Sequence, residues 1–429
     1  MRTINVGLIG LGTVGSGVVE IIARHGEQFR TRAGVDLVLA RVADRDPARA
    51  DALGIPAEGF STDAGDIIGD PAIDIVIELV GGTGVARDMV LDALAAGKSV
   101  VTANKALMAT HGQEVMDAAA ARGVDILFEA AVGGGIPIIG PLKHALVSNE
   151  VQAVYGIVNG TTNYMLTRMA EDGLDYDTAL SEAQARGFAE ADPTADVDGL
   201  DAAAKIAILA SIAFNSRVAF ADVPAEGIRT ITPEDIAYAS EMGFAIKLMA
   251  IGRRTEGGID VRVHPTMIRA DHPLAQVSGV YNAIYVVGDA VGETMFFGEG
   301  AGSLPAASAV VGDVIEAARH IQRDCMGLVG CTCTEHLPLR DMADLETGYY
   351  VRLHVKDEPG VLGTIAGIFG ENGVSLASVI QKRTDESGHA EIVWVTHRAS
   401  ERRVQAALDG IRASDVLEAV GSVIRVEEL

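Results

Sequence analysis

The stretch INVGLIGLGTVG, residues 4–15, decides the fold of the first part of this 429-residue chain. It begins as a short apolar strand, and it ends in three glycines with the spacing GxGxxG. Apolar residues at positions 18, 19, 21 and 22 then follow with helical spacing. A strand, a glycine turn and a helix in this order are typical of the first βα unit of a dinucleotide-binding domain.

The glycine turn suits a pyrophosphate group. Glycines allow a tight turn and a close approach of the backbone, and the start of the helix offers free N–H groups and a positive dipole end. A plain turn is the alternative, because glycine-rich turns after strands are common. The order of the elements favours a dinucleotide, which we expect to contact Gly10, Gly12, Thr13, Val14 and Gly15.

The next predicted strand, residues 37–43, ends at Asp44 and Arg45 and leaves the choice between NAD and NADP open. An acid at this place accepts hydrogen bonds from the ribose of NAD, whereas an arginine favours the additional phosphate of NADP. Asp44 lies 29 residues after Gly15, whereas the usual spacing is ~20. We attribute the longer spacing to an inserted polar loop over residues 24–35.

Strands and helices continue to alternate as far as residue 128. We expect strands over residues 73–79, 99–102 and 125–128, and helices over residues 85–96 and 107–121. Repeated βα units predict an α/β fold with a doubly wound parallel (Rossmann) sheet, whose ligands gather at the carboxyl ends of the strands. Lys105 follows such an end, so we consider contact with cofactor or substrate alongside the ordinary alternative of a solvated loop lysine.

A second informative stretch, GFAEADPTADVDGLDAAAK at residues 187–205, places five carboxylates and one lysine at the start of a helix. That helix, residues 200–214, is apolar on nearly every face, and such helices lie in protein interiors. We therefore expect Lys205 to be buried, with Asp201 one turn earlier on the same face. A surface ion pair is the alternative. Burying a single charge in an apolar helix carries a desolvation cost, and a residue that is retained at this cost usually has a function. A buried amine suits proton transfer to or from a carbonyl or alcohol oxygen.

The composition predicts a soluble globular protein with several domains. Hydrophobic residues make up 48% of the chain, and the formal net charge is −25. With no cluster of Lys or Arg, this charge argues against nucleic acid and anionic membranes as partners. We also expect no membrane span and no signal peptide, because the apolar runs are short and interrupted by glycines.

The three cysteines, Cys325, Cys331 and Cys333, are too few and too clustered for a disulfide framework, which predicts a reducing cytoplasmic location. Cys331, Cys333 and His336 could be drawn as a metal site, but a fourth ligand at a standard spacing is missing. Free thiols in a connecting segment are the preferred interpretation.

Two loops after strands could bind ligands. The glycine-rich loop that begins at Glu129 combines one carboxylate with backbone carbonyls, which suits a hard cation, although a bare turn is the simpler interpretation. A predicted strand over residues 151–158 leads into NGTTNY. Thr161 or Thr162 is the expected N-cap of the helix beyond, and the start of that helix could also hold a substrate carboxylate.

The rest of the chain divides by pattern. Mixed strands and helices up to about residue 320 predict an α+β substrate and association domain, and residues 348–429 have the order βαββαβ of a ferredoxin-like module. The expected domains are residues 1–136 for nucleotide binding, 137–322 for substrate binding and dimerisation, 323–347 as a linker, and 348–429 as a regulatory module.

Taken together, these segments resemble homoserine dehydrogenase along essentially the whole chain, with a C-terminal ACT domain. The resemblance rests on GLGTVG, TANKALMA, EAAVGGGIPII, NGTTNYML, GFAEADPTADVDGLDAAAKIAILA and GEGAGSLPAASAVVGDV. The last segment departs slightly from the family, since Glu299 stands where arginine or proline is frequent and Ala306 where threonine is frequent.

The resemblance implies a reversible, NAD- or NADP-dependent interconversion of L-homoserine and L-aspartate 4-semialdehyde in threonine, methionine and isoleucine biosynthesis. Lys205 would donate the proton to the aldehyde oxygen, and Lys105 would assist. The substrate would be bound by Glu190, Asp196, Asp201 and Thr161. Further cofactor contacts would come from Arg45, Thr102, Lys105, Gly187 and Gly302, and a sodium-like cation would lie on Glu129 and the carbonyls of Val132, Gly134 and Ile136.

The ACT resemblance is carried by DEPGVL at residues 357–362 and NGVS at residues 372–375. It implies feedback inhibition by threonine, although ACT modules can also serve only to join subunits, here in a homodimer or homotetramer. Asp192 and Asp198 have no assigned role and are expected to be solvated or capping residues.

Two other functions remain as alternatives. One is another nicotinamide-dependent oxidoreductase of amino-acid-derived carbonyls, such as an aspartate-semialdehyde or dihydrodipicolinate type. The first of these usually needs a catalytic cysteine, and the three cysteines of this chain lie in the linker. The other is a non-catalytic sensor that binds NAD and an amino acid, against which Lys105, Glu190, Asp201 and Lys205 argue.

Overall fold

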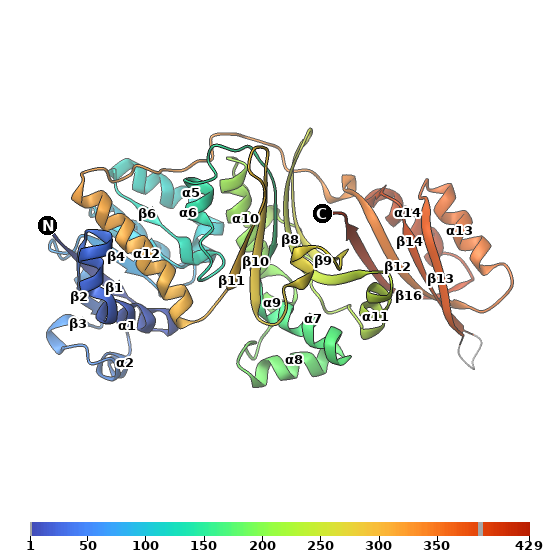
Figure 1. Ribbon diagram of the computed structural model, residues 1–429, viewed down its shortest axis with the longest axis horizontal. Helices are drawn as coiled ribbons and strands as arrows, with labels where there is room; N and C mark the ends of the chain where they lie inside the picture. Colours follow the sequence, from blue (N-terminus) through green and yellow to red (C-terminus); the bar gives the residue numbers. More distant parts are fainter. Residues whose placement is uncertain (1, 385–388) are drawn as a thin grey trace. The chain divides into compact units, whose positions relative to one another are not determined.

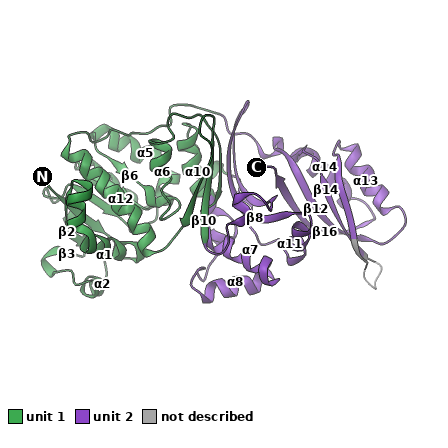
Figure 2. Ribbon diagram, in the orientation of Figure 1, with its two compact units in different colours: residues 1–158, 203–223, 281–337 green, residues 159–202, 224–280, 338–429 purple. Residues whose placement is uncertain are grey.

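The computed structural model describes residues 2–384 and 389–429, which form two compact units (Figure 2). Unit 1 contains residues 1–158, 203–223 and 281–337, and unit 2 contains residues 159–202, 224–280 and 338–429. Both units are therefore assembled from separated segments of the chain. In the described part of the chain, no helix has the length and apolar character needed to cross a membrane.

Unit 1 is built on a six-stranded sheet with the order β3-β2-β1-β4-β5-β6, in which every neighbouring pair is parallel (Figure 1). Its strands are β1 (Thr3–Ile9), β2 (Asp36–Ala43), β3 (Phe60–Ser61), β4 (Ile75–Glu78), β5 (Ser99–Thr102) and β6 (Ile126–Leu127). The strand order reverses direction between β1 and β4, which is the place where doubly wound sheets bind their ligands. The predicted α/β Rossmann class is confirmed.

Helices cover this sheet and complete its core. They are α1 (Thr13–Gln28), α2 (Pro47–Ala52), α3 (Gly65–Ile68), α4 (Val85–Ala95), α5 (Lys105–Arg122), α6 (Ile139–Lys143) and α12 (Ser303–Gln322). Short 3₁₀ turns occur at Ala57–Gly59, Glu129–Ala131 and Phe220–Asp222. Helix α12 packs against α1, and Val310 and Val314 share one buried cluster with Val6 and Val18 (Figure 1). A helix from late in the chain thus belongs to the core of the first domain.

The expectation of a polar loop over residues 24–35 is wrong. Helix α1 continues to Gln28, and a π-helix over Phe29–Ala33 follows and ends at Gly34, whose φ is 72°. Phe29 and Ala33 pack against the buried cluster of unit 1, which gives this segment a reason to stay helical. The polar residues that suggested a loop occupy its exposed face.

Unit 1 also contains an antiparallel group with the order β11-β10-β7. Its strands are β7 (Val151–Ile157), β10 (Tyr281–Gly288) and β11 (Gly292–Glu299). Strand β11 was not predicted. Its side chains are all exposed or half-buried, so it lacks the buried apolar face that identifies a strand in a sequence.

Unit 2 holds the middle helices and a long hairpin. The helices are α7 (Gly160–Asp172), α8 (Tyr176–Ala185), α9 (Thr194–Val197) and α11 (Pro233–Glu241), with a 3₁₀ turn at Pro273–Gln276. Helix α10 (Leu200–Ala213) starts in unit 2 and continues into unit 1. Strands β8 (Phe244–Thr255) and β9 (Gly258–Arg269) pair antiparallel over their whole lengths. Both are longer than the apolar stretches at residues 246–252 and 259–264, from which strands are expected.

The C-terminal module has the predicted ferredoxin-like order. It consists of β12 (Glu346–Lys356), α13 (Val361–Glu371), β13 (Leu376–Thr384), β14 (His389–Thr396), α14 (Glu401–Arg412) and β16 (Leu417–Glu427), with a 3₁₀ turn at Met342–Asp344 and a short β15 (Ala399–Ser400). The sheet order is β16-β12-β14-β13, and all three pairings are antiparallel. Tyr349, Phe369, Trp394 and Leu408 form its core between the sheet and the two helices.

The module is joined to the rest of unit 2 through the sheet as well as through the chain. Strand β16 pairs parallel with β9, with Arg425 opposite Thr266 and Glu427 opposite Ile268. The strand order in unit 2 is therefore β8-β9-β16-β12-β14-β13 (Figure 1). This shared sheet was not apparent from the sequence, because no local pattern encodes the pairing of strands so far apart.

Candidate active site

The glycine turn after β1 has the geometry that a pyrophosphate needs. Gly10 has a φ of 103°, and a Cβ at this position would lie 2.8 Å from the carbonyl oxygen of Leu79. A Cβ on Gly15 would lie 2.0 Å from the carbonyl oxygen of Gly10. A Cβ on Gly12 would meet nothing within 4 Å, so this part of the turn faces open space. Close packing on one side and open space on the other fit a dinucleotide at the start of α1.

A cleft of about 380 Å³ adjoins this turn and is lined by Gly10, Gly12, Asp44, Arg45 and Arg49, among others. The Asp44 carboxylate accepts hydrogen bonds from the backbone N–H groups of Leu11 at 2.6 Å and Asp46 at 2.9 Å. Burial acts to raise the pKa of Asp44, but these two hydrogen bonds and Arg49 hold it below its usual value. Asp44 is therefore ionised at neutral pH, and its hydrogen bond with the N–H of Leu11 joins the end of β2 to the glycine turn.

Two arginines accompany that carboxylate. Arg45 is exposed at the mouth of the cleft, and Arg49 of α2 lies 3.6 Å from the carboxylates of both Asp44 and Asp46. Arg45 was expected from the sequence, whereas Arg49 was not. Arg49 lies three residues after Asp46, the N-cap of α2, and this spacing was the available signal.

The carboxyl ends of β4 and β5 carry a second polar network in unit 1. The hydroxyl of Thr102 donates to Glu78 at 2.7 Å, and Glu78 also accepts the N–H groups of Val80 and Gly81. Thr102 also accepts the N–H of Asn104, whose side chain caps α5 by accepting the N–H of Leu107. Thr102 is fully buried, so it acts within the protein on the loop before Lys105. Lys105 is exposed at the first position of α5.

Gly302 lies beside the glycine turn. It is the N-cap residue of α12 with a φ of 127°, and the hydroxyl of Ser303 donates to the carbonyl oxygen of Thr13 at 2.6 Å. Gly187 is exposed after α8 in unit 2, with a φ of 76° and open space where a Cβ would lie. The structure thus places Gly302 beside the turn at residues 10–15, whereas Gly187 belongs to the other unit.

Lys205 is buried, as its apolar helix predicted, with only 8% of its surface exposed. Its Nζ donates to the carbonyl oxygen of Val158 at 2.6 Å, at the end of β7. Asp201 lies one turn earlier on α10 and is 7% exposed. A lysine and a carboxylate are therefore both held inside the protein at the start of one helix.

Asn159 organises the acids of unit 2 and was missed in the sequence. Its side-chain N–H₂ group donates to Asp196 at 2.7 Å and to Asp201 at 2.9 Å. Its side-chain oxygen accepts the N–H of Thr162, so Asn159 is the N-cap of α7 and the expectation of Thr161 or Thr162 is wrong. The helix begins at Gly160, which leaves both threonines inside the first turn.

Thr161 belongs to the same cluster, and Glu190, Asp192 and Asp198 each have other surroundings. The Thr161 hydroxyl lies 3.2 Å from an Asp196 oxygen and donates to the Phe188 carbonyl at 2.7 Å, which joins Thr161 to the cluster around Asn159. Glu190 is exposed. Asp192 is exposed, as expected, and accepts the N–H of Thr194 at the start of α9, whereas Asp198 forms an unexpected ion pair with Arg229.

The glycine-rich loop after β6 is organised around Glu129. Its carboxylate accepts the N–H groups of Ile138, Ile139 and Gly140, at 2.5, 2.7 and 2.6 Å. Its own N–H donates to Asp313 of α12, a buried residue whose pKa is raised well above its usual value by burial and by the nearby Glu129 charge. Asp313 was not anticipated.

Metal-binding side chains do not cluster in the described ranges, 2–384 and 389–429. They contain no group of three or more His, Cys, Asp or Glu side chains arranged to hold a metal ion. The three cysteines are free. A cation beside Glu129 would therefore depend on backbone oxygens such as those of Val132, Gly134 and Ile136.

A dinucleotide turn on a doubly wound sheet and a buried lysine one turn after a buried carboxylate are the features of an NAD(P)-dependent oxidoreductase. Comparison with protein families specifies it further. Residues 10–129 match the NAD-binding domain of homoserine dehydrogenase, residues 137–315 match homoserine dehydrogenase, and residues 349–414 match the ACT domain. The chain belongs to the homoserine dehydrogenase family.

Full-length relatives agree with this assignment. The chain is 47% identical to the homoserine dehydrogenase of Synechocystis sp. over 99% of both chains, and 43% identical to that of Bacillus subtilis over 100% of this chain and 99% of the relative. The crystal structure of a homoserine dehydrogenase from Thiobacillus denitrificans has a TM-score of 0.95 at 43% identity, covering 100% of this chain and 99% of that one. A hyperthermophilic archaeal homoserine dehydrogenase in complex with NADPH has a TM-score of 0.63 at 28% identity, covering 74% of this chain and 98% of that one.

Proposed function

We propose that the chain reduces L-aspartate 4-semialdehyde reversibly to L-homoserine, with Lys205 as the proton donor. The observation that carries this proposal is the start of α10, where Lys205 is buried one turn after a buried Asp201. Reduction of an aldehyde builds negative charge on its oxygen, and a positioned ammonium group can meet that charge and supply the proton. In the reverse direction the neutral amine takes the proton from the alcohol.

The acids are proposed to hold the amino-acid part of the substrate. Asp196 and Asp201 both accept hydrogen bonds from the Asn159 amide, which fixes their positions before a substrate arrives. We assign the substrate ammonium to Glu190 and Asp196, and the substrate carboxylate to Thr161 at the start of α7. Asp201 would bind the substrate and orient Lys205. Such preorganisation is the main way in which a site lowers the cost of ordering its reactants.

The cofactor is proposed to lie along the glycine turn, with contacts to Gly10, Gly12, Thr13, Val14 and Gly15. When bound, its nicotinamide ring supplies or accepts the hydride. Arg45 and Arg49 provide positive charge beside Asp44 at the end of β2, which supports the use of NADP. The archaeal relative that was solved in complex with NADPH agrees with this assignment. Lys105 and Thr102 would position the nicotinamide end through the network around Glu78, and Gly187 and Gly302 would flank the cofactor.

Further proposals rest on the family resemblance and on the free cysteines. We assign the enzyme to threonine, methionine and isoleucine biosynthesis, in the cytoplasm, as a homodimer or homotetramer. Threonine would inhibit it through the ACT domain. A sodium-like cation would be bound by the Glu129 carboxylate and by the carbonyl oxygens of Val132, Gly134 and Ile136. Because Glu129 already accepts three N–H groups, a weakly held monovalent ion fits better than a divalent one.

The proton-transfer role of Lys205 is tested by Lys205→Met. Loss of a general acid usually costs ~10²–10⁴-fold in rate, so we expect turnover to fall by at least ~10²-fold while the dissociation constant for NADP stays within about twofold. The matched control is Lys247→Met, since Lys247 is equally buried at 6% exposure and also donates to a backbone carbonyl at 2.6 Å. Near-normal turnover in Lys205→Met would refute the assignment.

A further inference from the structure

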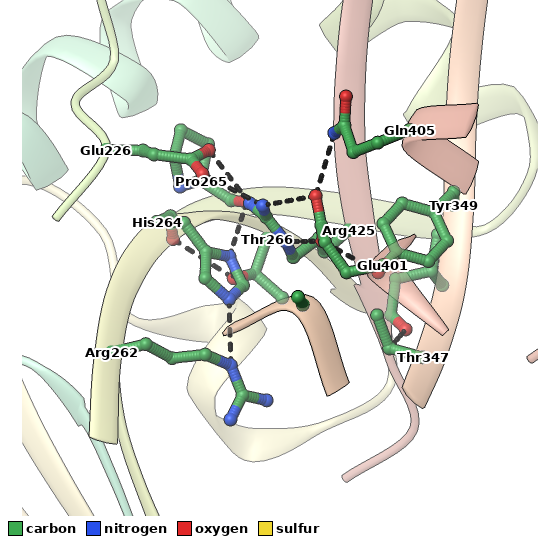
Figure 3. Close-up of polar contacts among 12 residues, drawn as sticks. Glu226, Arg262, His264, Pro265, Thr266, Thr347, Tyr349, Glu401, Gln405 and Arg425 are labelled. Carbon is green, nitrogen blue, oxygen red and sulfur yellow. Dashed lines mark hydrogen bonds and ion pairs between the residues drawn. The ribbon is translucent and has the colours of Figure 1, made fainter. Parts of the chain in front are cut away.

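The junction between β9 and β16 contains a buried arginine that contacts both sides. Arg425 of β16 is 7% exposed. Its two terminal nitrogens each donate to one carboxylate oxygen of Glu226 at 2.8 Å, and its Nε donates to Glu401 at 2.9 Å (Figure 3). A bidentate arginine–carboxylate pair fixes both the distance and the orientation of its partners.

On the side of the C-terminal module, Arg425 is held rigidly. Glu401 is the first residue of α14 and is buried. Its carboxylate also accepts hydrogen bonds from the Tyr349 hydroxyl at 2.8 Å and from Gln405 at 2.8 Å (Figure 3). Strand β12, helix α14 and strand β16 therefore all determine where the guanidinium group lies.

On the other side, Glu226 belongs to a short segment that runs beside β9. Its N–H donates to the Val263 carbonyl at 2.8 Å, and the N–H of Val263 donates to the Pro224 carbonyl at 2.9 Å. The Glu226 side chain itself is half exposed, at 52%. Its carboxylate could therefore point to solvent, and the contact with Arg425 holds it in place.

The same segment packs directly against the loop that carries the substrate acids. The N–H of Ile228 donates to the Val197 carbonyl at 2.8 Å. A Cβ on Gly227 would lie 2.0 Å from that carbonyl oxygen, and a Cβ on Gly199 would lie 3.3 Å from the carbonyl oxygen of Glu226. Residues 197–199 connect Asp196 to α10. Because the two segments are packed in direct contact, a displacement of Glu226 would also displace Asp196 and Asp201.

We propose that the Glu226–Arg425 pair is the contact through which the ACT module sets the positions of Asp196 and Asp201. Both members are positioning residues, because neither is assigned a contact with the substrate. A change in the module that moves β16 would then alter the affinity for homoserine, and a regulatory ligand could use this route. The inference rests on the proposed substrate role of Asp196 and Asp201.

The test uses Glu226→Ala in the full chain, because Arg425 keeps Glu401 as a partner and the half-exposed Glu226 can be replaced without opening the core. We expect KM for homoserine to rise about tenfold, the factor that ~1.4 kcal/mol of lost binding produces, with KM for NADP and kcat within about twofold. Glu226→Gln, which retains an acceptor oxygen for Arg425, should give an intermediate KM. Amide hydrogen exchange of residues 194–201 should become faster in Glu226→Ala.

A matched control is Asp271→Ala in the same unit. Asp271 also forms a bidentate pair with an arginine, Arg269, but that pair is exposed at the end of β9. This variant should leave KM for homoserine and the exchange of residues 194–201 unchanged. An equal rise in both variants would mean that any loss of an ion pair perturbs the unit, and it would overturn the specific coupling.

Asp196→Asn separates failure of the coupling from failure of the site. If Asp196→Asn raises KM for homoserine while Glu226→Ala leaves KM unchanged, the coupling is wrong and the substrate site stands. If Asp196→Asn leaves KM unchanged, the proposed substrate site is wrong. A rise in both variants, together with the faster exchange in Glu226→Ala, supports the proposal.

Discussion

The glycine turn at residues 10–15 and the acid loop at residues 187–205 differ in what holds them in shape. The turn depends on the absence of side chains, since a Cβ at Gly10 or Gly15 would collide with neighbouring backbone. The acid loop depends on polar partners from distant parts of the chain, namely Asn159 for the half-buried Asp196 and the buried Asp201, and the segment at residues 226–229 for its backbone. The local backbone geometry of the turn can be inferred from a short motif, whereas the distant partners that hold the acid loop cannot.

The largest effect on the turn is expected for Gly15→Ala. The new methyl group would lie 2.0 Å from the Gly10 carbonyl oxygen, so the turn must open. We expect affinity for NADP to fall by at least ~10²-fold, which corresponds to ~2.7 kcal/mol of lost binding. The control is Gly26→Ala on the same helix, where a Cβ meets nothing within 4 Å and helix propensity favours alanine. Fluorescence titration with NADPH measures both, and normal binding by Gly15→Ala would contradict the account of the turn.

The acid loop should respond most strongly to Asn159→Ala. Removing the amide leaves Asp196 and Asp201 without their shared donor, so we expect KM for homoserine to rise about tenfold. The loss of the N-cap also costs ~1 kcal/mol of stability. Asp175→Ala controls for that cost, because Asp175 caps α8 through the N–H of Thr178 at 2.8 Å without touching the acids. KM is measured by steady-state kinetics at varied homoserine concentrations. Equal KM values in the two variants would contradict the role of Asn159.

This contrast explains which features the sequence revealed. The parallel sheet, β5, the burial of Lys205 and the ferredoxin-like order all follow from apolar periodicity and glycine placement, which are local signals. Asn159, Asp313 and Arg425 contribute through contacts with residues 37 to 199 positions away, and no spacing rule connects such pairs. The π-helix at Phe29–Ala33 was missed for the opposite reason, because its polar composition concealed two side chains that pack on the core.

A smaller effect is expected at the edge of the cofactor cleft. Arg49→Ala removes a positive charge beside Asp44 and Asp46, so we expect KM for NADP to rise about fivefold while KM for NAD changes little, since a solvent-exposed ion pair is worth up to ~1 kcal/mol. Arg41→Ala is the control, because Arg41 pairs with Asp70 and does not line the cleft. A parallel change in both cofactors would show that Arg49 supports the fold of α2 instead of selecting the phosphate.

The burial of Lys247 should appear in the pH dependence of stability. Burial lowers the pKa of Lys247 from its ordinary 10.5 to about 8, while Glu171 acts in the opposite direction. Between these two values the unfolded chain binds a proton that the folded chain does not, so the free energy of unfolding should rise with pH across that window. Denaturant titrations should show a weaker rise in Lys247→Met than in the wild type. The exposed Lys356→Met should keep the wild-type slope, and a Lys247→Met slope equal to that of the wild type would contradict the assigned pKa.

The reaction itself is the central claim, and one measurement tests it directly. The full chain is mixed with L-homoserine and either NADP or NAD, and the absorbance of the reduced nicotinamide is followed with and without threonine. We predict a rise in absorbance that depends on homoserine, is faster with NADP and is slowed by threonine. Binding of the dinucleotide with no change in absorbance at any homoserine concentration would contradict the account and indicate a sensor.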